Sequence, residues 1–177
     1  MRLQSLWISL VLLLMAGVVY AQQPGRNFKI MHDPESGEPL YRGQITFTDL
    51  ARMNVFELEK KAQQYRPDIS VMKPLKPLLD SCQVVVFLGT WCADSRQLVP
   101  QLYQVLRDLH YPFQTIPIYA LDRHKASGIG KETEYKVQLV PSIILYKEGR
   151  EVGRITESIQ SKNIETDLLN ILRHPLH

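Results

Sequence analysis

An unbroken apolar run, Gln83–Gly89, constrains the fold more than any other feature of this chain. It lacks the polar alternation of a strand with one wet face, so it predicts a central strand that is covered on both faces. Beyond it the periodicity changes, because Leu98, Leu102, Leu106 and Leu109 recur at the spacing of one helix face. We therefore expect a buried strand, a tight turn and an amphipathic helix in direct succession.

The remaining elements follow from shorter signals. Spacing and turn residues predict a helix from an N-cap at Thr48 to about Tyr65 and a strand at Gln114–Asp122. A short polar helix or turn at Lys131–Lys136 and a hairpin at Ser142–Ile155 follow. A closing helix starts at Ile164, with its N-cap within Ser161–Asn163. The prolines in Val71–Leu79 allow only a short helix or turn there. From Gln83 onward the order is β-α-β-α-β-β-α, and the hairpin makes the sheet mixed.

The first 21 residues have the pattern of a signal peptide. Arg2 precedes an apolar block, Leu6–Val19, which is shorter than the roughly 20 residues that span a bilayer. We expect cleavage between Ala21 and Gln22, with an uncleaved anchor as the alternative. The mature protein would then be periplasmic or secreted, without a stable membrane anchor, in a compartment where disulfides persist.

Length and composition limit the classes of function. A chain of 177 residues suits one main domain, and a net charge of +3 without long basic runs argues against nucleic acid as a partner. Two cysteines exclude a disulfide-rich scaffold and a four-cysteine zinc site, and the five histidines lack metal-ligand spacing. We expect no metal and no cofactor. Residues 22–42, rich in Pro and Gly, predict an irregular arm or weak hairpin without a core.

Cys92 lies where the predicted strand gives way to the predicted helix. Free amide hydrogens and the positive end of the helix dipole favour an anion there, and the thiolate is the nucleophilic form of cysteine. Asp94 opposes this effect, whereas the Ser95 hydroxyl can donate a hydrogen bond to the sulfur. Arg96 could point to solvent. A buried structural cysteine is the competing interpretation.

Two stretches resemble the thioredoxin superfamily. Val84–Ser95, followed by Pro100, resembles its active-site strand, Trp-Cys turn and proline-containing helix, and Val140–Gly149 resembles its cis-proline loop and hairpin. The resemblance covers roughly residues 84–173. It implies an α/β, three-layer sandwich with a mixed central sheet flanked by helices. We expect a signal peptide at 1–21, an N-terminal extension with one helix at 22–69 and a thioredoxin-like domain at 70–177.

The resemblance also implies roles for single residues. Cys92 would be the attacking cysteine, and Trp91 would offer substrate a flat apolar contact. Pro141 would be cis and pack against the sulfur, and Val140 would offer its backbone to an extended peptide. Two departures stand out: Ser95 occupies the place of the resolving cysteine, and Val86 the place of the family's buried acid.

Cys82 cannot replace the missing resolving cysteine. It precedes the strand that Cys92 follows, which separates the two sulfurs by roughly 20 Å, whereas a disulfide needs α carbons within about 7 Å. We expect Cys82 to be a free buried thiol, with pairing to another molecule as the alternative.

The leading expectation is a thiol-disulfide oxidoreductase of the monothiol type, with Cys92 and Ser95 at the catalytic site and Trp91, Val140 and Pro141 contacting substrate. Its partners would be protein or small-molecule thiols and disulfides, and the protein would be a monomer. A non-catalytic peptide-binding module is the alternative, and the export signal disfavours cluster binding through one cysteine. Arg123–Lys125 could form a cationic spot at the site's edge or a solvated turn.

Overall fold

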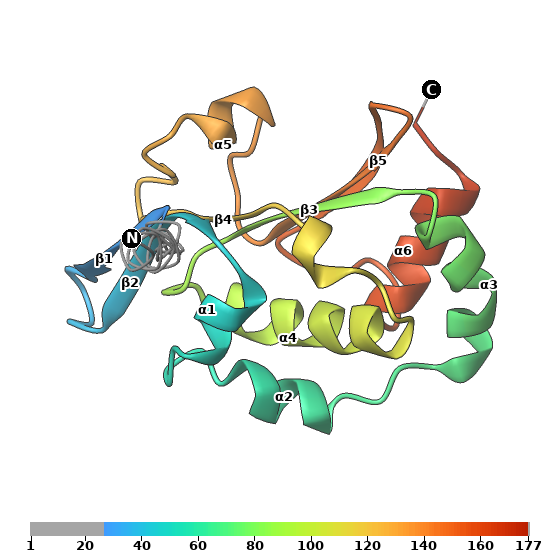
Figure 1. Cartoon of the computed structure of the whole chain (residues 1–177), viewed down its shortest axis with the longest axis horizontal. Coiled ribbons are helices and arrows are strands. Elements are labelled where there is room, and N and C mark those ends of the chain that lie inside the picture. Colours follow the sequence, from blue (N-terminus) through green and yellow to red (C-terminus); the bar gives the residue numbers. More distant parts are fainter. Residues whose placement is uncertain (1–26, 177) are drawn as a thin grey trace, which may run out of the picture.

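The computed structural model describes residues 27–176, which form one six-stranded sheet and the helices around it (Figure 1). The strands are β1 (Phe28–His32), β2 (Pro39–Ile45), β3 (Gln83–Leu88), β4 (Ile118–Ala120), β5 (Ser142–Lys147) and β6 (Arg150–Thr156). The helices are α1 (Phe47–Ala51), α2 (Leu58–Gln64), α3 (Ile69–Leu79), α4 (Ala93–Asp108), α5 (Lys131–Glu134) and α6 (Ile164–Arg173), with a 3-10 turn at Phe113–Thr115. The predicted signal peptide lies outside the described residues.

The sheet has the order β1-β2-β4-β3-β5-β6, in which β3 and β4 are parallel and the other neighbours antiparallel. Val84, Val86 and Leu88 of β3 join a core cluster with α1, α2, α3, α4 and α6, whereas Val85 and Phe87 join a second cluster on the opposite face. Figure 1 shows α5 on that opposite side. The expected mixed sheet with helices on both faces is confirmed, and the central strand is buried from Val84 to Leu88, with Gln83 exposed.

The arm predicted at residues 22–42 is, in its described part, an ordered hairpin. β2 pairs with β4, so the hairpin extends the main sheet and β1 becomes its outer strand. Leu40 and Tyr41 of β2 are buried. The expectation of no core there was wrong, because the apolar contacts of this short segment come from strands far away in the sequence.

The single helix expected from Thr48 to Tyr65 is two helices. Thr46, not Thr48, is the N-cap of α1: the Thr46 hydroxyl accepts from Asp49 N–H at 3.2 Å, and the Asp49 carboxylate accepts from Thr46 N–H at 2.9 Å. Glu57, with φ of 52°, separates α1 and its following turns from α2. The N-terminal extension predicted at residues 22–69 therefore contains α1 and α2 in its described part rather than one helix.

α3 is longer than predicted, because 11 residues are helical despite Pro74 and Pro77. Each proline deprives one preceding carbonyl of its helical donor. Neither proline is on the buried face, which is made of Met72, Leu75 and Leu79, so water can satisfy those carbonyls.

From β3 onward the predicted order of elements is confirmed, including the hairpin and the Asn163 N-cap of the last helix. The strand predicted at Gln114–Asp122 is shorter, since only Ile118–Ala120 is paired. Among residues 27–176 no helix combines the length and the apolarity needed to cross a bilayer.

Candidate active site

Cys92 is the N-cap residue of α4, as expected from the change in periodicity. Its side chain is 9% exposed, and its thiol donates to the Val140 carbonyl with a sulfur–oxygen distance of 3.4 Å. The Val140–Pro141 peptide bond is cis, and both residues are buried. The sulfur thus lies between the first turn of a helix, whose N–H groups lack carbonyl partners within the helix, and a backbone carbonyl of a distant loop.

Ser95 is fully buried one turn further along α4. Its hydroxyl oxygen accepts from Gly89 N–H at 3.1 Å and so ties the helix back to the end of β3. No hydrogen bond between Ser95 and the Cys92 sulfur occurs among residues 27–176, so the expected hydroxyl–thiol contact is not formed. Val86, which is fully buried in the apolar cluster, provides no ionisable group beneath the site.

The Trp91 ring, which is expected to offer substrate a flat apolar contact, is itself held by contacts within the protein. Its ring folds back over Gly89, where an added Cβ would lie 2.7 Å from the indole. The indole N–H donates to the Leu121 carbonyl at 2.9 Å. Two cations lie over the ring, with the Arg123 guanidinium carbon 4.9 Å and the Lys125 Nζ 4.3 Å from its centroid. The surface next to Cys92 is therefore partly cationic.

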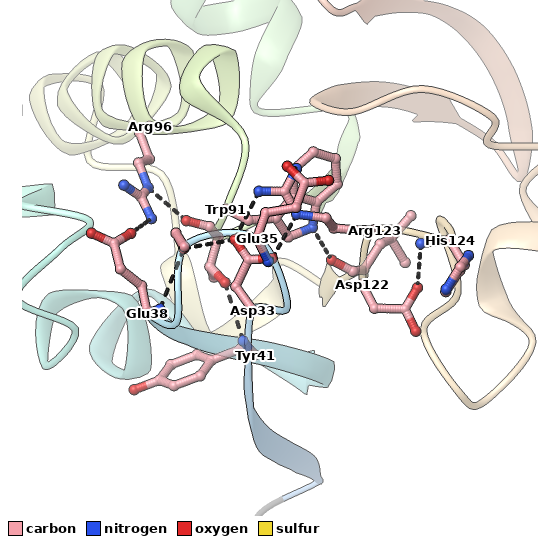
Figure 2. Close-up of polar contacts among 12 residues, drawn as sticks. Asp33, Glu35, Glu38, Tyr41, Trp91, Arg96, Asp122, Arg123 and His124 are labelled. Atoms are coloured by element: carbon pink, nitrogen blue, oxygen red, sulfur yellow. Dashed lines mark hydrogen bonds and ion pairs between the residues drawn. The ribbon is translucent and has the colours of Figure 1, made fainter.

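The hairpin β1–β2 contacts Thr90 and Arg96, which precede and follow Cys92 in the sequence, and we call residues 90–96 the reactive turn. Figure 2 shows Tyr41, Glu38 and Arg96 in these contacts. The Tyr41 N–H donates to the Thr90 hydroxyl at 3.1 Å. Arg96 bridges the other side: it donates to the Thr90 carbonyl and to the Glu38 carboxylate, each at 2.6 Å. Arg96 is thus held between the hairpin and the turn rather than directed to solvent.

A third contact joins the loop between β1 and β2 to Arg123. The guanidinium makes a two-pronged ion pair with Asp33 at 2.6 and 2.7 Å, and a further pair with Glu35 at 2.6 Å. The Asp33 side chain is only 2% exposed. Hydrogen bonding from Arg123 holds the pKa of the Asp33 carboxyl well below its usual range, and Ser36 and Glu35 N–H add to this.

Sequence reasoning missed Asp33, Glu35, Glu38 and the ion pairs of Arg123. The Pro34 to Gly37 stretch indicates a turn, but nothing in it indicates a partner 90 residues away. Arg123 and Lys125 lie at the edge of the site, and the partly exposed Arg123 is held in ion pairs with Asp33 and Glu35 rather than being free in a solvated turn.

Cys82 is the second thiol, and it lies at the opposite end of β3. Both cysteines are free, which confirms that they do not pair with each other. The Cys82 side chain is buried, its thiol donates to the Leu78 carbonyl at 3.2 Å, and burial raises its pKa. Within residues 27–176 no cluster of three or more His, Cys, Asp or Glu side chains could hold a metal ion.

Comparison with known proteins identifies the family. Residues 75–170, more than half of the chain, match the thioredoxin family model. A thioredoxin of Chlamydia pneumoniae is 33% identical over 87 residues, which are 49% of this chain and 78% of the relative. A thioredoxin-like protein of Synechocystis sp. is 34% identical over 85 residues, which are 48% of this chain and 70% of the relative.

Among solved structures, a Pseudomonas aeruginosa protein of unknown function aligns with a TM-score of 0.53 at 14% identity, over 73% of this chain and 92% of that one, and this likeness shows the fold alone. The family match spans the Trp-Cys turn, the cis Val140–Pro141 bond and the strands between them. The thioredoxin family acts on protein thiols and disulfides, and the fold indicates thiol-disulfide oxidoreductase activity. The chain belongs to the thioredoxin family.

Proposed function

We propose that this protein carries out monothiol thiol-disulfide exchange through Cys92. The Cys92 thiolate attacks one sulfur of a partner's disulfide, a mixed disulfide forms, and the partner's other sulfur leaves as a thiolate. An external thiol then attacks the mixed disulfide, which regenerates Cys92. The net result is exchange of the external thiol for one half of the partner's disulfide.

One observation carries the proposal: Cys92 is the N-cap of α4, and the residue one helical turn later is Ser95 rather than a second cysteine. In a two-cysteine cycle a thiol at that second position would attack the mixed disulfide, but the Ser95 hydroxyl accepts from Gly89 N–H and cannot form a disulfide. The apolar Val86 supports the same mechanism, because a protein that does not resolve its own mixed disulfide needs no buried base to take a proton from a second cysteine.

In this proposal Trp91, Val140 and Pro141 contact the partner, and the protein works as a monomer after export. Cleavage between Ala21 and Gln22 would release it, without a membrane anchor, into the periplasm or the medium. Disulfides persist in such a compartment, so partner disulfides are available there for attack by Cys92.

The decisive experiment is to trap the mixed disulfide. Cells that make the full chain are quenched with acid and N-ethylmaleimide, and extracts are run on non-reducing gels. We expect adducts that disappear on reduction, are absent in Cys92→Ser and remain in the matched variant Cys82→Ser. Mass spectrometry of the adduct then identifies the partner.

Adducts that persist in Cys92→Ser would contradict the proposal. A second candidate, a non-catalytic module that binds an extended peptide, is favoured by Leu139, which is 41% exposed beside Val140. It predicts that Cys92→Ala retains partner capture under reducing conditions, where no mixed disulfide can form.

A further inference from the structure

Two cations lie on the side of the site formed by Trp91, and they differ in how far nearby carboxylates neutralise their charge. Trp91 directly precedes Cys92 and packs against the same apolar cluster. Arg123 and Lys125 both lie over its ring. Hydrogen bonding to Asp33 is the main cause of the raised pKa of Arg123, and a smaller raising effect comes from Cys92, so Arg123 is within electrostatic reach of the thiol. We refer to Trp91, Arg123 and Lys125 as the cationic wall.

Arg123 does not contribute a net positive charge to this wall. Asp33 and Glu35 occupy its guanidinium, and Asp33 is almost completely buried. The two carboxylates outweigh one guanidinium, so the cluster as a whole is not positive. The two hydrogen bonds between the Arg123 guanidinium and the Asp33 carboxylate restrain the guanidinium plane and so hold it over the Trp91 indole.

Lys125 differs, because none of the ion pairs among residues 27–176 includes it. The other acid nearby, Asp122, is occupied. Its carboxylate accepts from the N–H groups of His124 and Ala126 at 2.9 and 3.0 Å, and it pairs with Arg42 of β2 at 3.1 Å. The backbone turn at Lys125, with φ of 62°, is therefore fixed by its neighbours.

We infer that Lys125 is a specificity-determining residue that selects disulfides with a negatively charged group next to the sulfur that Cys92 attacks. The inference rests on the proposed function and adds the class of substrate to it. The step remains thiolate attack and release of the partner's second sulfur as a thiolate. A carboxylate on the Trp91 side of that disulfide meets the Lys125 ammonium group, which has no ion-pair partner within residues 27–176, and this attraction favours the encounter and the attack.

The other charges near Cys92 define where the anion must lie. Asp94 is exposed in the first turn of α4 and would repel a carboxylate on that side. Asp33→Asn and Arg123→Gln should change the rate of Cys92 with anionic disulfides in opposite directions. Asp33→Asn removes a negative charge beside Arg123 and should raise this rate. Arg123→Gln leaves the negative charges of Asp33 and Glu35 without their cation and should lower it. A purely structural ion pair would change the reaction in the same direction when either partner is removed.

The experiment measures how fast Cys92 reacts with disulfides of different charge, in a Cys82→Ser background so that one thiol reports. The probes are dianionic 5,5′-dithiobis(2-nitrobenzoate), neutral 2,2′-dithiodipyridine and dicationic cystamine. We expect Lys125→Gln to lower the anionic-to-cationic rate ratio about three-fold at low salt, the size expected for one charge near the reacting atoms in water. Arg123→Gln should lower the ratio and Asp33→Asn should raise it.

The matched control is Lys147→Gln, at the far end of β5, where the ratio should not change. The effect of Lys125→Gln should also vanish at about 1 M salt, where charges are screened within about 3 Å. An unchanged ratio in Lys125→Gln, with the neutral probe still reacting at Cys92, overturns this inference and leaves the proposed function standing. Failure of all three probes to react with Cys92 overturns both.

Discussion

Cys82 and Cys92 lie at opposite ends of β3 and are almost equally buried, at 8% and 9% exposure, yet they meet opposite ends of helices. Cys82 follows the C-terminus of α3, and its thiol points at the Leu78 carbonyl. Cys92 begins α4, where backbone N–H groups and the positive end of the helix dipole lie. Exposure alone would rank the two thiols as equals. The polarity of the adjacent helix end distinguishes them.

The two ends of β3 are also held in place differently. At the Cys92 end, ion pairs join the β1–β2 hairpin to the reactive turn through Arg96 and Arg123. At the Cys82 end, the buried Tyr111 hydroxyl donates to the Cys82 carbonyl at 2.7 Å. The first arrangement responds to charge and pH, whereas the second depends on one neutral hydrogen bond in an apolar setting.

The largest expected difference is in alkylation of the two thiols. In the folded protein at neutral pH, iodoacetamide should modify Cys92 at least about 100-fold faster than Cys82, because the thiolate is the reacting form. Burial raises the pKa of the Cys82 thiol, whereas the N-terminus of α4 beside Cys92 favours an anion. Timed quenching and peptide mass spectrometry measure both rates. In denaturant the two rates should converge, and equal rates in the folded state would contradict the comparison.

Removing the neutral hydrogen bond should affect one end only. Tyr111→Phe leaves the Cys82 carbonyl without its donor, and we expect a loss of about 1–2 kcal/mol in the free energy of unfolding, measured with urea. Local opening should then speed the alkylation of Cys82 about ten-fold, a factor that corresponds to about 1.4 kcal/mol. The same labelling experiment checks this. An equal increase at Cys92 would show that the two ends open together.

The smallest expected change is in the response of the Cys92 end to acid. The lowered pKa of Asp33 means that its stabilising contribution is present above the unfolded value near 3.9 and is lost only as pH falls through the lower folded value. Trp91 is the only tryptophan after residue 21, so its emission reports on the cationic wall. In the protein cleaved after Ala21, the emission should stay constant from pH 7 to about pH 4.

Asp33→Asn provides the matched comparison for this titration, because its amide cannot form the ion pair at any pH. Its emission at pH 7 should already differ from that of the unmodified protein. A transition of the unmodified protein centred near pH 4, the range of an ordinary carboxyl group, would contradict the proposed persistence of the Asp33–Arg123 pair.

Sequence patterns predicted the elements whose signals are local. The apolar β3, the leucine spacing of α4 and the Gly149 hairpin each require only neighbouring residues, and they placed Cys92 correctly at the start of a helix. The ordered hairpin β1–β2 was missed because the burial of Leu40 and Tyr41 requires strand pairing with β4. α3 was underestimated because the effect of a proline depends on which face of the helix meets water.

Of the site, too, only the features with local sequence signals were predictable, and its long-range contacts were not. The Cys92 thiol meets the Val140 carbonyl beside the cis Val140–Pro141 bond, whereas the Ser95 hydroxyl bonds to Gly89 and not to the sulfur. The substrate contacts of Trp91, Val140 and Pro141 stay predictions. The ion pairs around them join residues 58 and 90 positions apart, and no local pattern encodes such a choice of partners.

The three acids that pair with Arg96 and Arg123 around the site, Asp33, Glu35 and Glu38, all lie in the loop between β1 and β2, outside the apolar clusters that hold the sheet together. The loop precedes the region matched by the family model. Substitutions in this short connection could therefore retune the chemistry of the thiol without disturbing the folding core. Related chains could diversify in their choice of partners there while they keep the same scaffold and the same nucleophile.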